Sequence, residues 1–159
     1  SARQLNGLEL LGIVEAALRD SGLPPERLEL ELTETLMMSD VNLTLKTLKE
    51  LGQMGVKVAI DDFGTGYSSL AYLKRLPITK LKLDRSFVHD IPYDTNDKAI
   101  ARAILRLGDA VNLEVLAEGI ETVAQYEFLL AEGCAMGQGF LYAKPMPASI
   151  CAEYLLTHS

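Results

Sequence analysis

Segments with apolar residues at helical spacing alternate along the chain with short β-branched or alternating apolar runs, which predicts alternating helices and strands. Apolar residues at helical spacing predict six helices. Four of them cover residues 7–21, 68–75, 98–111 and 122–132, and the last runs from Pro147 to near Leu156. The remaining helix follows Asp40, ends at Gly52 or Gly55, and turns Leu45, Leu48 and Leu51 inward. Short β-branched or alternating runs predict strands over 28–32, 56–60, 80–83, 113–117 and 139–142. Residues 91–97, which include Pro92, are expected to form a turn-rich connection.

This strict alternation favours an α/β fold with a parallel sheet. The strands recur every roughly 23 to 34 residues, close to the βα unit of a (β/α)8 barrel. We therefore predict a (β/α)8 TIM-barrel variant with about five βα units in this chain. A doubly wound open sheet is the alternative. A barrel gathers functional residues from many strand ends on one face, whereas an open sheet concentrates them at one crevice.

Composition narrows the class of partner. The chain has 159 residues, of which 48% are hydrophobic and 23% charged, which suits one globular domain with an apolar core. Its net charge is −7 and it has no Lys/Arg stripe, so we expect no binding to duplex nucleic acid or to an anionic membrane surface. A small anionic substrate stays possible if metal ions supply local positive charge.

The two cysteines, Cys134 and Cys151, form neither a disulfide framework nor a zinc set. We interpret them as free thiols in a reducing cytoplasm. No apolar run approaches the roughly 18 residues of a membrane span, and we expect no signal peptide. We therefore expect a cytoplasmic domain, with membrane attachment of a longer parent protein left open.

Acidic and polar residues lie at or near one end of every predicted strand. The first strand ends in Glu29-Leu-Glu-Leu-Thr-Glu34, the second in Asp61-Asp62, the third carries Lys82, Asp84 and Arg85, the fourth ends in Glu118-Gly-Ile-Glu121, and the fifth begins near Gln138. Each acid taken alone is explained as well by the capping of a following helix or turn. Their repetition at one strand end after another favours a metal site, because adjacent carboxylates repel each other unless a cation holds them.

This chemistry fits a two-metal hydrolase. Of two adjacent aspartates, Asp61 and Asp62, one can bridge two cations while its neighbour serves one, and cations about 3.5–4 Å apart stabilise an in-line displacement at phosphorus. Lys82 beside the attacking water can orient it, or deprotonate it if its pKa is lowered.

At these residues the chain resembles the C-terminal part of the EAL domain, the bacterial cyclic di-GMP phosphodiesterase module. The matching motifs, which follow one another in family order and cover nearly the whole chain, are 31–34 (ELTE), 61–70 (DDFGTGYSSL), 81–87 (LKLDRSF), 117–122 (AEGIET), 133–140 (GCAMGQGF) and 144–147 (KPMP). The chain departs from the family at Ala135, where many members have Asp, and at Phe140, where Tyr is common. The resemblance implies one partial EAL domain over residues 1–159.

The resemblance also implies a fold and a role for each site residue. The fold is a TIM-barrel variant whose first strand runs antiparallel. The metal ligands of two Mg²⁺ or Mn²⁺ ions would be Glu31, Asp61, Asp62 and Glu118. Lys82 would hold the nucleophilic water, with Glu118 and Gln138 as the other catalytic residues. Glu34 would anchor the loop 62–69, with Asp84 and Glu121 in supporting positions.

The implied reaction is hydrolysis of cyclic di-GMP to linear pGpG. The partners implied are cyclic di-GMP, a second copy in a homodimer, and N-terminal sensory or GGDEF domains. The Glu-Ala-Leu motif and a metal-binding Asn lie upstream of Ser1 in the family, so we expect the isolated chain to be inactive. Two alternatives stay open: a degenerate domain that senses cyclic di-GMP without cleaving it, and a fragment that serves only as an interaction scaffold.

Overall fold

The structure is a computed structural model that describes residues 7–66 and 73–158. Its five strands are β1 (Glu29–Thr33), β2 (Lys57–Phe63), β3 (Lys80–Leu83), β4 (Glu114–Ala117) and β5 (Met136–Gly137). The α-helices are α1 (Gly7–Ser21), α2 (Glu34–Ser39), α3 (Val41–Gln53), α5 (Thr95–Val111), α6 (Val123–Ala131) and α7 (Ala148–His158). Two 3-10 turns, η1 (Pro25–Arg27) and η2 (Arg85–Phe87), precede β1 and follow β3.

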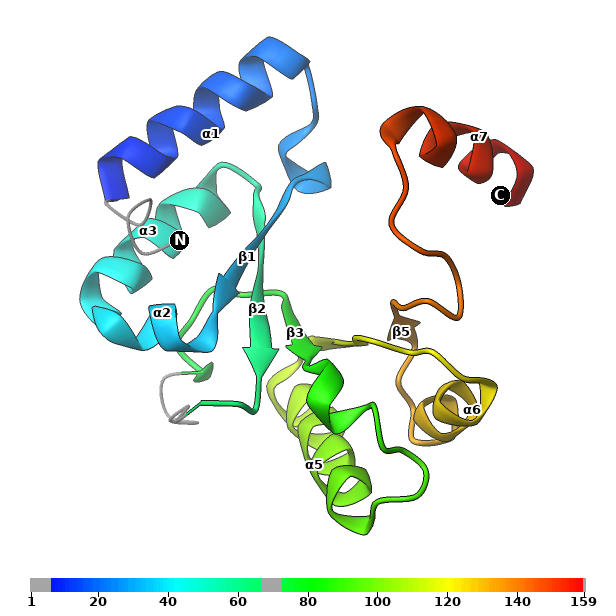
Figure 1. Cartoon of the computed structure of the whole chain (residues 1–159). Helices are drawn as coiled ribbons and strands as arrows, with labels where there is room; N and C mark the ends of the chain where they lie inside the picture. The colour runs from blue at the N-terminus through cyan, green and yellow to red at the C-terminus, as the bar shows by residue number, and fades with distance from the viewer. Residues whose placement is uncertain (1–6, 67–72, 159) are drawn as a thin grey trace.

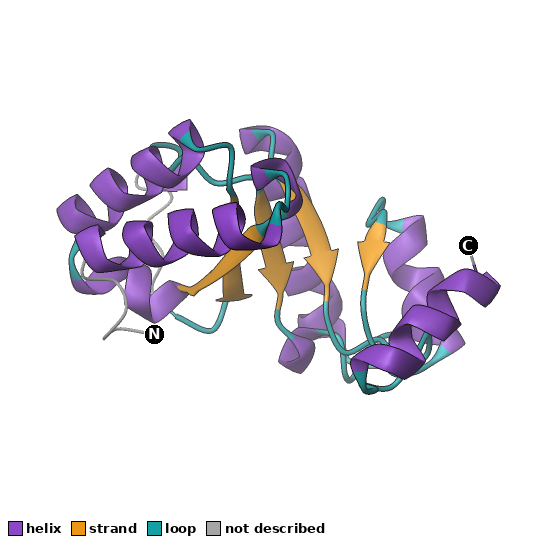
Figure 2. Cartoon of the chain, turned by 90° about the horizontal axis from the view of Figure 1, so that it is seen from above, coloured by secondary structure: helices purple, strands orange, loops and turns teal. Residues whose placement is uncertain are grey.

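The five strands form one sheet in the order β1-β2-β3-β4-β5, and every neighbouring pair is parallel. Strand order therefore follows chain order, as it does around a barrel, with no reversal of the kind that defines a doubly wound sheet. Figures 1 and 2 show the strands curving as an open arc with helices packed around them. The predicted α/β barrel variant is confirmed as this open sector, and the doubly wound alternative is wrong.

The two faces of the sheet differ in chemistry. Residues Leu30 and Leu32 of β1 pair in register with Val58 and Ile60 of β2, and Ile60 pairs with Leu81. Leu32, Val58, Ile60 and Leu81 belong to the buried core beneath the helices, and Leu30 packs against it. Because side chains alternate along a strand, the acidic and basic residues between them share the opposite face. The polar face carries the candidate site.

Side-chain caps fix where several helices begin. The Asp40 carboxylate accepts a hydrogen bond from Leu43 N at 3.0 Å and starts α3. Asp94 accepts hydrogen bonds from Asn96 N and Asp97 N at 2.7 and 2.9 Å, so α5 begins at Thr95. The expected turn-rich segment 91–97 therefore ends earlier than predicted, because the Asp94 cap recruits Thr95–Asp97 into the helix.

The predicted strand over 139–142 is wrong. The fifth strand is Met136–Gly137, which pairs with Leu116 and Ala117, whereas Tyr142 N bonds back to Gly139 O in a turn. A Cβ atom at Gly139 would overlap the backbone of Ile120, so the chain passes too close there for a regular strand with side chains. Most of the predicted helix 68–75 lies outside the described residues, and α2 was not predicted.

Figure 1 shows α7 beyond the last strand, at the end of an extended connection. Over the described ranges 7–66 and 73–158, no strand pairs with the outer edge of β1 or of β5. None of the helices in these ranges is long and apolar enough to cross a membrane.

Candidate metal site

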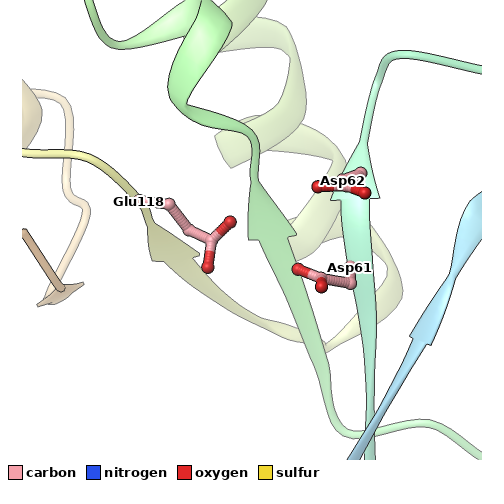
Figure 3. A group of neighbouring side chains, drawn as sticks. All are labelled: Asp61, Asp62 and Glu118. Atoms are coloured by element: carbon pink, nitrogen blue, oxygen red, sulfur yellow. The ribbon is translucent and has the colours of Figure 1, made fainter. Parts of the chain in front are cut away.

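Three carboxylates meet at the carboxyl ends of the strands. Asp61 and Asp62 extend from the end of β2, and Glu118 follows β4, with Asp61 and Glu118 pointing toward each other (Figure 3). One oxygen of each of the three side chains lies within 4.8 Å of the others. The sheet order explains this convergence, since β2 and β4 flank β3 and all three strands end on the same side.

Lys82 stands among these acids and is 4% exposed. Its Nζ lies 2.7 Å from Glu31 Oε1, 2.9 Å from Asp61 Oδ1 and 2.8 Å from Glu118 Oε1. Burial alone would lower the pKa of Lys82, but the contacts with Glu118, Glu31 and Asp61 outweigh burial and raise the pKa above its usual range. Lys82 is therefore a charged ammonium in these surroundings. The lowered pKa that would let it deprotonate water is not found.

A backbone irregularity places the two aspartates. The register between β2 and β3 shifts between Ile60 and Phe63, and Asp62 has a φ of 53°, in the left-handed region. The shift lets two consecutive side chains reach the same edge of the sheet. Burial, followed by the charges of Asp61 and Asp84, raises the pKa of Asp62. The site therefore holds more negative charge than its protein cation balances.

Glu118 has two protein partners. Besides Lys82, its Oε1 accepts a hydrogen bond of 2.7 Å from Gln138 Nε2, the residue that follows β5. Burial raises the pKa of Glu118, Lys82 lowers it, and Asp61 and Glu31 raise it again, with a net upward shift. Gly119 follows with a φ of 69°, and a Cβ there would lie 2.5 Å from Arg85 Cβ. Glycine is needed at this position for the chain to turn beside η2.

The Glu34 side chain binds backbone N–H groups of the loop that follows β2. It is 2% exposed, and its Oε2 accepts hydrogen bonds from Gly64 N at 3.1 Å and Gly66 N at 3.2 Å. A Cβ at Gly66 would lie 2.9 Å from the Glu34 carboxylate, so glycine permits this approach. The described part of the loop is thus tied to Glu34, and the role of Glu34 as a loop anchor stays a prediction, as does its effect on function.

The remaining predicted residues lie at different places. Asp84 caps η2 through Ser86 N at 2.9 Å and contacts Asp62. Burial would raise the pKa of Asp84, but hydrogen bonds with Ser86, Asp62 and Arg85 together outweigh it and hold the pKa below its usual value. Glu31 reaches Lys82 but is not part of the group of three carboxylates. Glu121 is exposed and does not join that group either.

Gln125 is a supporting residue that the sequence analysis missed. Its side chain is 4% exposed, its Oε1 accepts from Glu121 N and Thr122 N at 2.8 and 2.9 Å, and its Nε2 donates to His89 O at 2.9 Å. It therefore fixes the segment that follows Glu118. The spacing Thr122-x-x-Gln125 is a capping-box signal and could have identified it.

These side chains fit a divalent cation. Carboxylate oxygens are the ligands that Mg²⁺ and Mn²⁺ favour. Asp61 Oδ1 is buried and, apart from its ion pair with Lys82, accepts no hydrogen bond from the described residues. Asp61 thus has one protein donor among the described residues, the Lys82 ammonium, and lies within reach of two further carboxylates that a cation could join to it.

Comparison with known proteins identifies the family. A family model described as the EAL domain matches residues 1–145. The chain belongs to the EAL domain family. It is 50% identical over 148 residues to the bifunctional diguanylate cyclase/cyclic di-GMP phosphodiesterase MucR of Pseudomonas aeruginosa, an alignment that covers 93% of this chain and 22% of that protein. The chain thus spans about a fifth of the length of this relative.

Solved EAL structures share the fold. The PaMucR phosphodiesterase in complex with c-di-GMP has a TM-score of 0.91 at 49% identity, covering 95% of this chain and 61% of that one. A manganese/cy-diGMP complex of Klebsiella pneumoniae BlrP1 has a TM-score of 0.81 at 35% identity, covering 88% and 36%.

Ala135 is one of the two positions at which the chain departs from the family motifs. It lies before β5 and lines a cavity together with Leu113 and Glu114, at the amino ends of the strands.

Proposed function

We propose that this EAL chain forms part of a phosphodiesterase site that hydrolyses cyclic di-GMP to linear pGpG with two divalent cations, Mg²⁺ or Mn²⁺. The observation that supports it most is the grouping of Asp61, Asp62 and Glu118 at the carboxyl ends of parallel strands, with Lys82 in contact with Asp61 and Glu118. Relatives named as cyclic di-GMP phosphodiesterases, and neighbours solved with c-di-GMP and manganese, support the same substrate and ions.

The carboxylates would hold the ions. When bound, two cations supply a deprotonated water and neutralise charge on the phosphodiester. Asp61 is the proposed bridging ligand, with Asp62 and Glu118 beside it, because these three already lie within reach of one another. Glu31 is the proposed ligand from β1. It is 49% exposed and fixed in this structure by Lys82 alone among the contacts described, so its carboxylate can turn toward a cation.

Lys82 would act as a hydrogen-bond donor. Its ammonium is buried on the polar face and its raised pKa keeps it charged, so it can orient an attacking water or stabilise negative charge on phosphate oxygens. Gln138 would keep Glu118 in place through its 2.7 Å hydrogen bond. Glu34 would hold the loop that leads away from Asp62.

Hydrolysis assays separate this proposal from a sensor that only binds the nucleotide. The natural protein that carries this sequence is incubated with cyclic di-GMP and Mg²⁺ or Mn²⁺, and pGpG is measured. We expect metal-dependent pGpG formation that EDTA stops. Tight binding of cyclic di-GMP with no pGpG at any metal concentration would instead identify the degenerate sensor.

We further propose that residues 1–159 belong to a single EAL domain and that the domain pairs with a second copy. The family match supports the first statement. Light scattering of the purified protein measures the second, and a monomer at all concentrations would contradict it.

A further inference from the structure

A second ion pair lies beneath the candidate metal site on the same face of the sheet. Lys80 Nζ is 2.8 Å from both carboxylate oxygens of Glu29. Both side chains are largely covered, with exposed fractions of 13% for Lys80 and 28% for Glu29. The pair joins β1 to β3 and crosses β2, which lies between them.

The Glu29–Lys80 pair repeats the geometry of the Glu31–Lys82 pair at the metal site. Glu29 precedes Glu31 by two residues on β1, and Lys80 precedes Lys82 by two residues on β3, so both acids and both lysines share one face. Each lysine reaches across β2 to the glutamate on β1. The strand between them carries Ala59, in register with both Glu31 and Lys80, and its small side chain leaves room for the lower pair to cross.

The direction of the Lys80 side chain is selective. In the register between β3 and β4, Lys80 lies beside Glu114, an exposed acid on the neighbouring strand. Its ammonium nevertheless binds Glu29, two strands away in the other direction. The pairing with Glu29 therefore fixes the relation between β1 and β3, which are not themselves hydrogen-bonded neighbours.

The two bridges respond differently to a cation. A divalent ion held by Asp61, Asp62 and Glu118 competes with the Lys82 ammonium for the same oxygens, because like charges repel. We therefore expect a bound cation to weaken the contacts of Lys82 with Asp61 and Glu118. Among the contacts described, Glu29 and Lys80 touch none of the three grouped carboxylates, so we expect the Glu29–Lys80 pair to keep its contact when a cation binds.

We propose that Glu29 and Lys80 are positioning residues, a clasp that holds β1 against β3 so that Glu31 stays within reach of the cation site. This inference rests on the proposed function, since it requires that the carboxylates bind a divalent ion. It adds a pair of residues that bind neither metal nor substrate and act through the spacing of the strands.

The test is Mn²⁺ binding, measured by calorimetry on the natural protein that carries this sequence and on its variants E29Q, K80M and the reversed pair E29K/K80E. Supporting partners of metal ligands typically contribute about 10-fold or more to affinity, so each single variant is expected to bind Mn²⁺ about 10-fold more weakly. The reversed pair restores the contact and is expected to return to within about twofold of the parent. The matched control is E132Q, which breaks the Arg102–Glu132 pair of 2.7 Å on the helical side of the molecule and should leave Mn²⁺ affinity unchanged.

The direction of the change separates positioning from charge alone. A simple field effect would weaken Mn²⁺ binding in E29Q and strengthen it in K80M, because one variant removes a negative charge and the other a positive one. The clasp predicts weaker binding in both. Unchanged affinity in the single variants, opposite shifts, or a folded reversed pair that binds no better than they do would overturn the inference. If circular dichroism shows the single variants unfolded, the reversed pair decides alone. A natural protein that binds no Mn²⁺ would overturn the metal site and the clasp together, whereas normal binding in the parent with unchanged binding in the variants would overturn the clasp alone.

Discussion

Lys80 and Lys82 lie two residues apart on the same face of β3, yet the charges around them differ. Lys80 is matched by one carboxylate, Glu29, and the pair is balanced. Lys82 faces Glu31, Asp61 and Glu118, with Asp62 adjoining Asp61 in sequence, so its surroundings carry a large excess of negative charge. A partly buried cluster in which acids outnumber the protein's own cation is stabilised by bound protons or by a further cation. The charge-balanced Glu29–Lys80 pair can therefore serve a structural role, whereas the excess of acids around Lys82 can bind a cation.

The largest effect is expected from neutralising the acid at the centre of the cluster. Asp61→Asn keeps the shape of the side chain but removes the charge that would hold the cations. Hydrolysis of cyclic di-GMP by the natural protein should fall by more than about 100-fold, beyond the range usual for supporting residues. The measurement is pGpG formation at saturating Mn²⁺, with Glu29→Gln, which neutralises an acid of the lower pair, as the milder comparison. Near-normal turnover in Asp61→Asn would remove Asp61 from the metal site.

Replacing the lysine of the cluster should lower turnover more than substrate binding. Lys82→Ala removes the donor proposed to face the attacking water, and positioned proton donors and acceptors contribute about 10²–10⁴-fold to rate. We expect kcat to fall by at least about 100-fold with a smaller change in KM. Steady-state kinetics on the natural protein measure both constants. A change confined to KM would make Lys82 a phosphate-binding residue instead.

A smaller effect is expected from releasing the loop. Glu34→Ala removes the acceptor of the Gly64 and Gly66 amides and leaves the cluster itself untouched. The Mg²⁺ concentration needed for half-maximal activity should rise about 10-fold, with helical content retained. Titration of activity with Mg²⁺ and a far-ultraviolet circular dichroism spectrum check the two parts. An unchanged Mg²⁺ titration would leave Glu34 as a structural link only.

The smallest effect concerns stability without metal. Burial and neighbouring acids raise the pKa of Asp62, so the folded chain binds a proton there more tightly than the unfolded chain does. Stability from this group is therefore greatest at low pH and is lost as pH rises through the raised pKa. Asp62→Asn removes that loss and still suits a left-handed φ. In EDTA at pH 7.5 its Tm should rise by about 1–2 °C, a modest gain because solvent screens the group, with no gain at low pH. A Tm below that of the parent would contradict the repulsion.

The sequence predicted the cluster better than its supports. Asp61, Lys82 and Glu118 could be found from the sequence for two reasons. Charged side chains at the ends of buried strands destabilise the fold unless they pair with each other or bind a cation, and parallel strands bring these ends together. The last strand and the start of α5 were misplaced because a glycine contact with Ile120 and the Asp94 cap decide them, and both act through tertiary or local hydrogen-bond geometry. The Glu29–Lys80 clasp was out of reach because it depends on the register between strands 51 residues apart in sequence.

A manganese anomalous difference map, calculated from crystals of the natural protein that carries this sequence grown with Mn²⁺, tests the central claim most directly. The excess of carboxylates over Lys82 predicts a peak bounded by Asp61, Asp62 and Glu118, with the Lys82 ammonium displaced from at least one of its present contacts. Crystals of Asp61→Asn grown in the same way should lose the peak. A map with no peak at this edge of the sheet, or with Mn²⁺ bound elsewhere and Lys82 still holding all three carboxylates, would contradict the account.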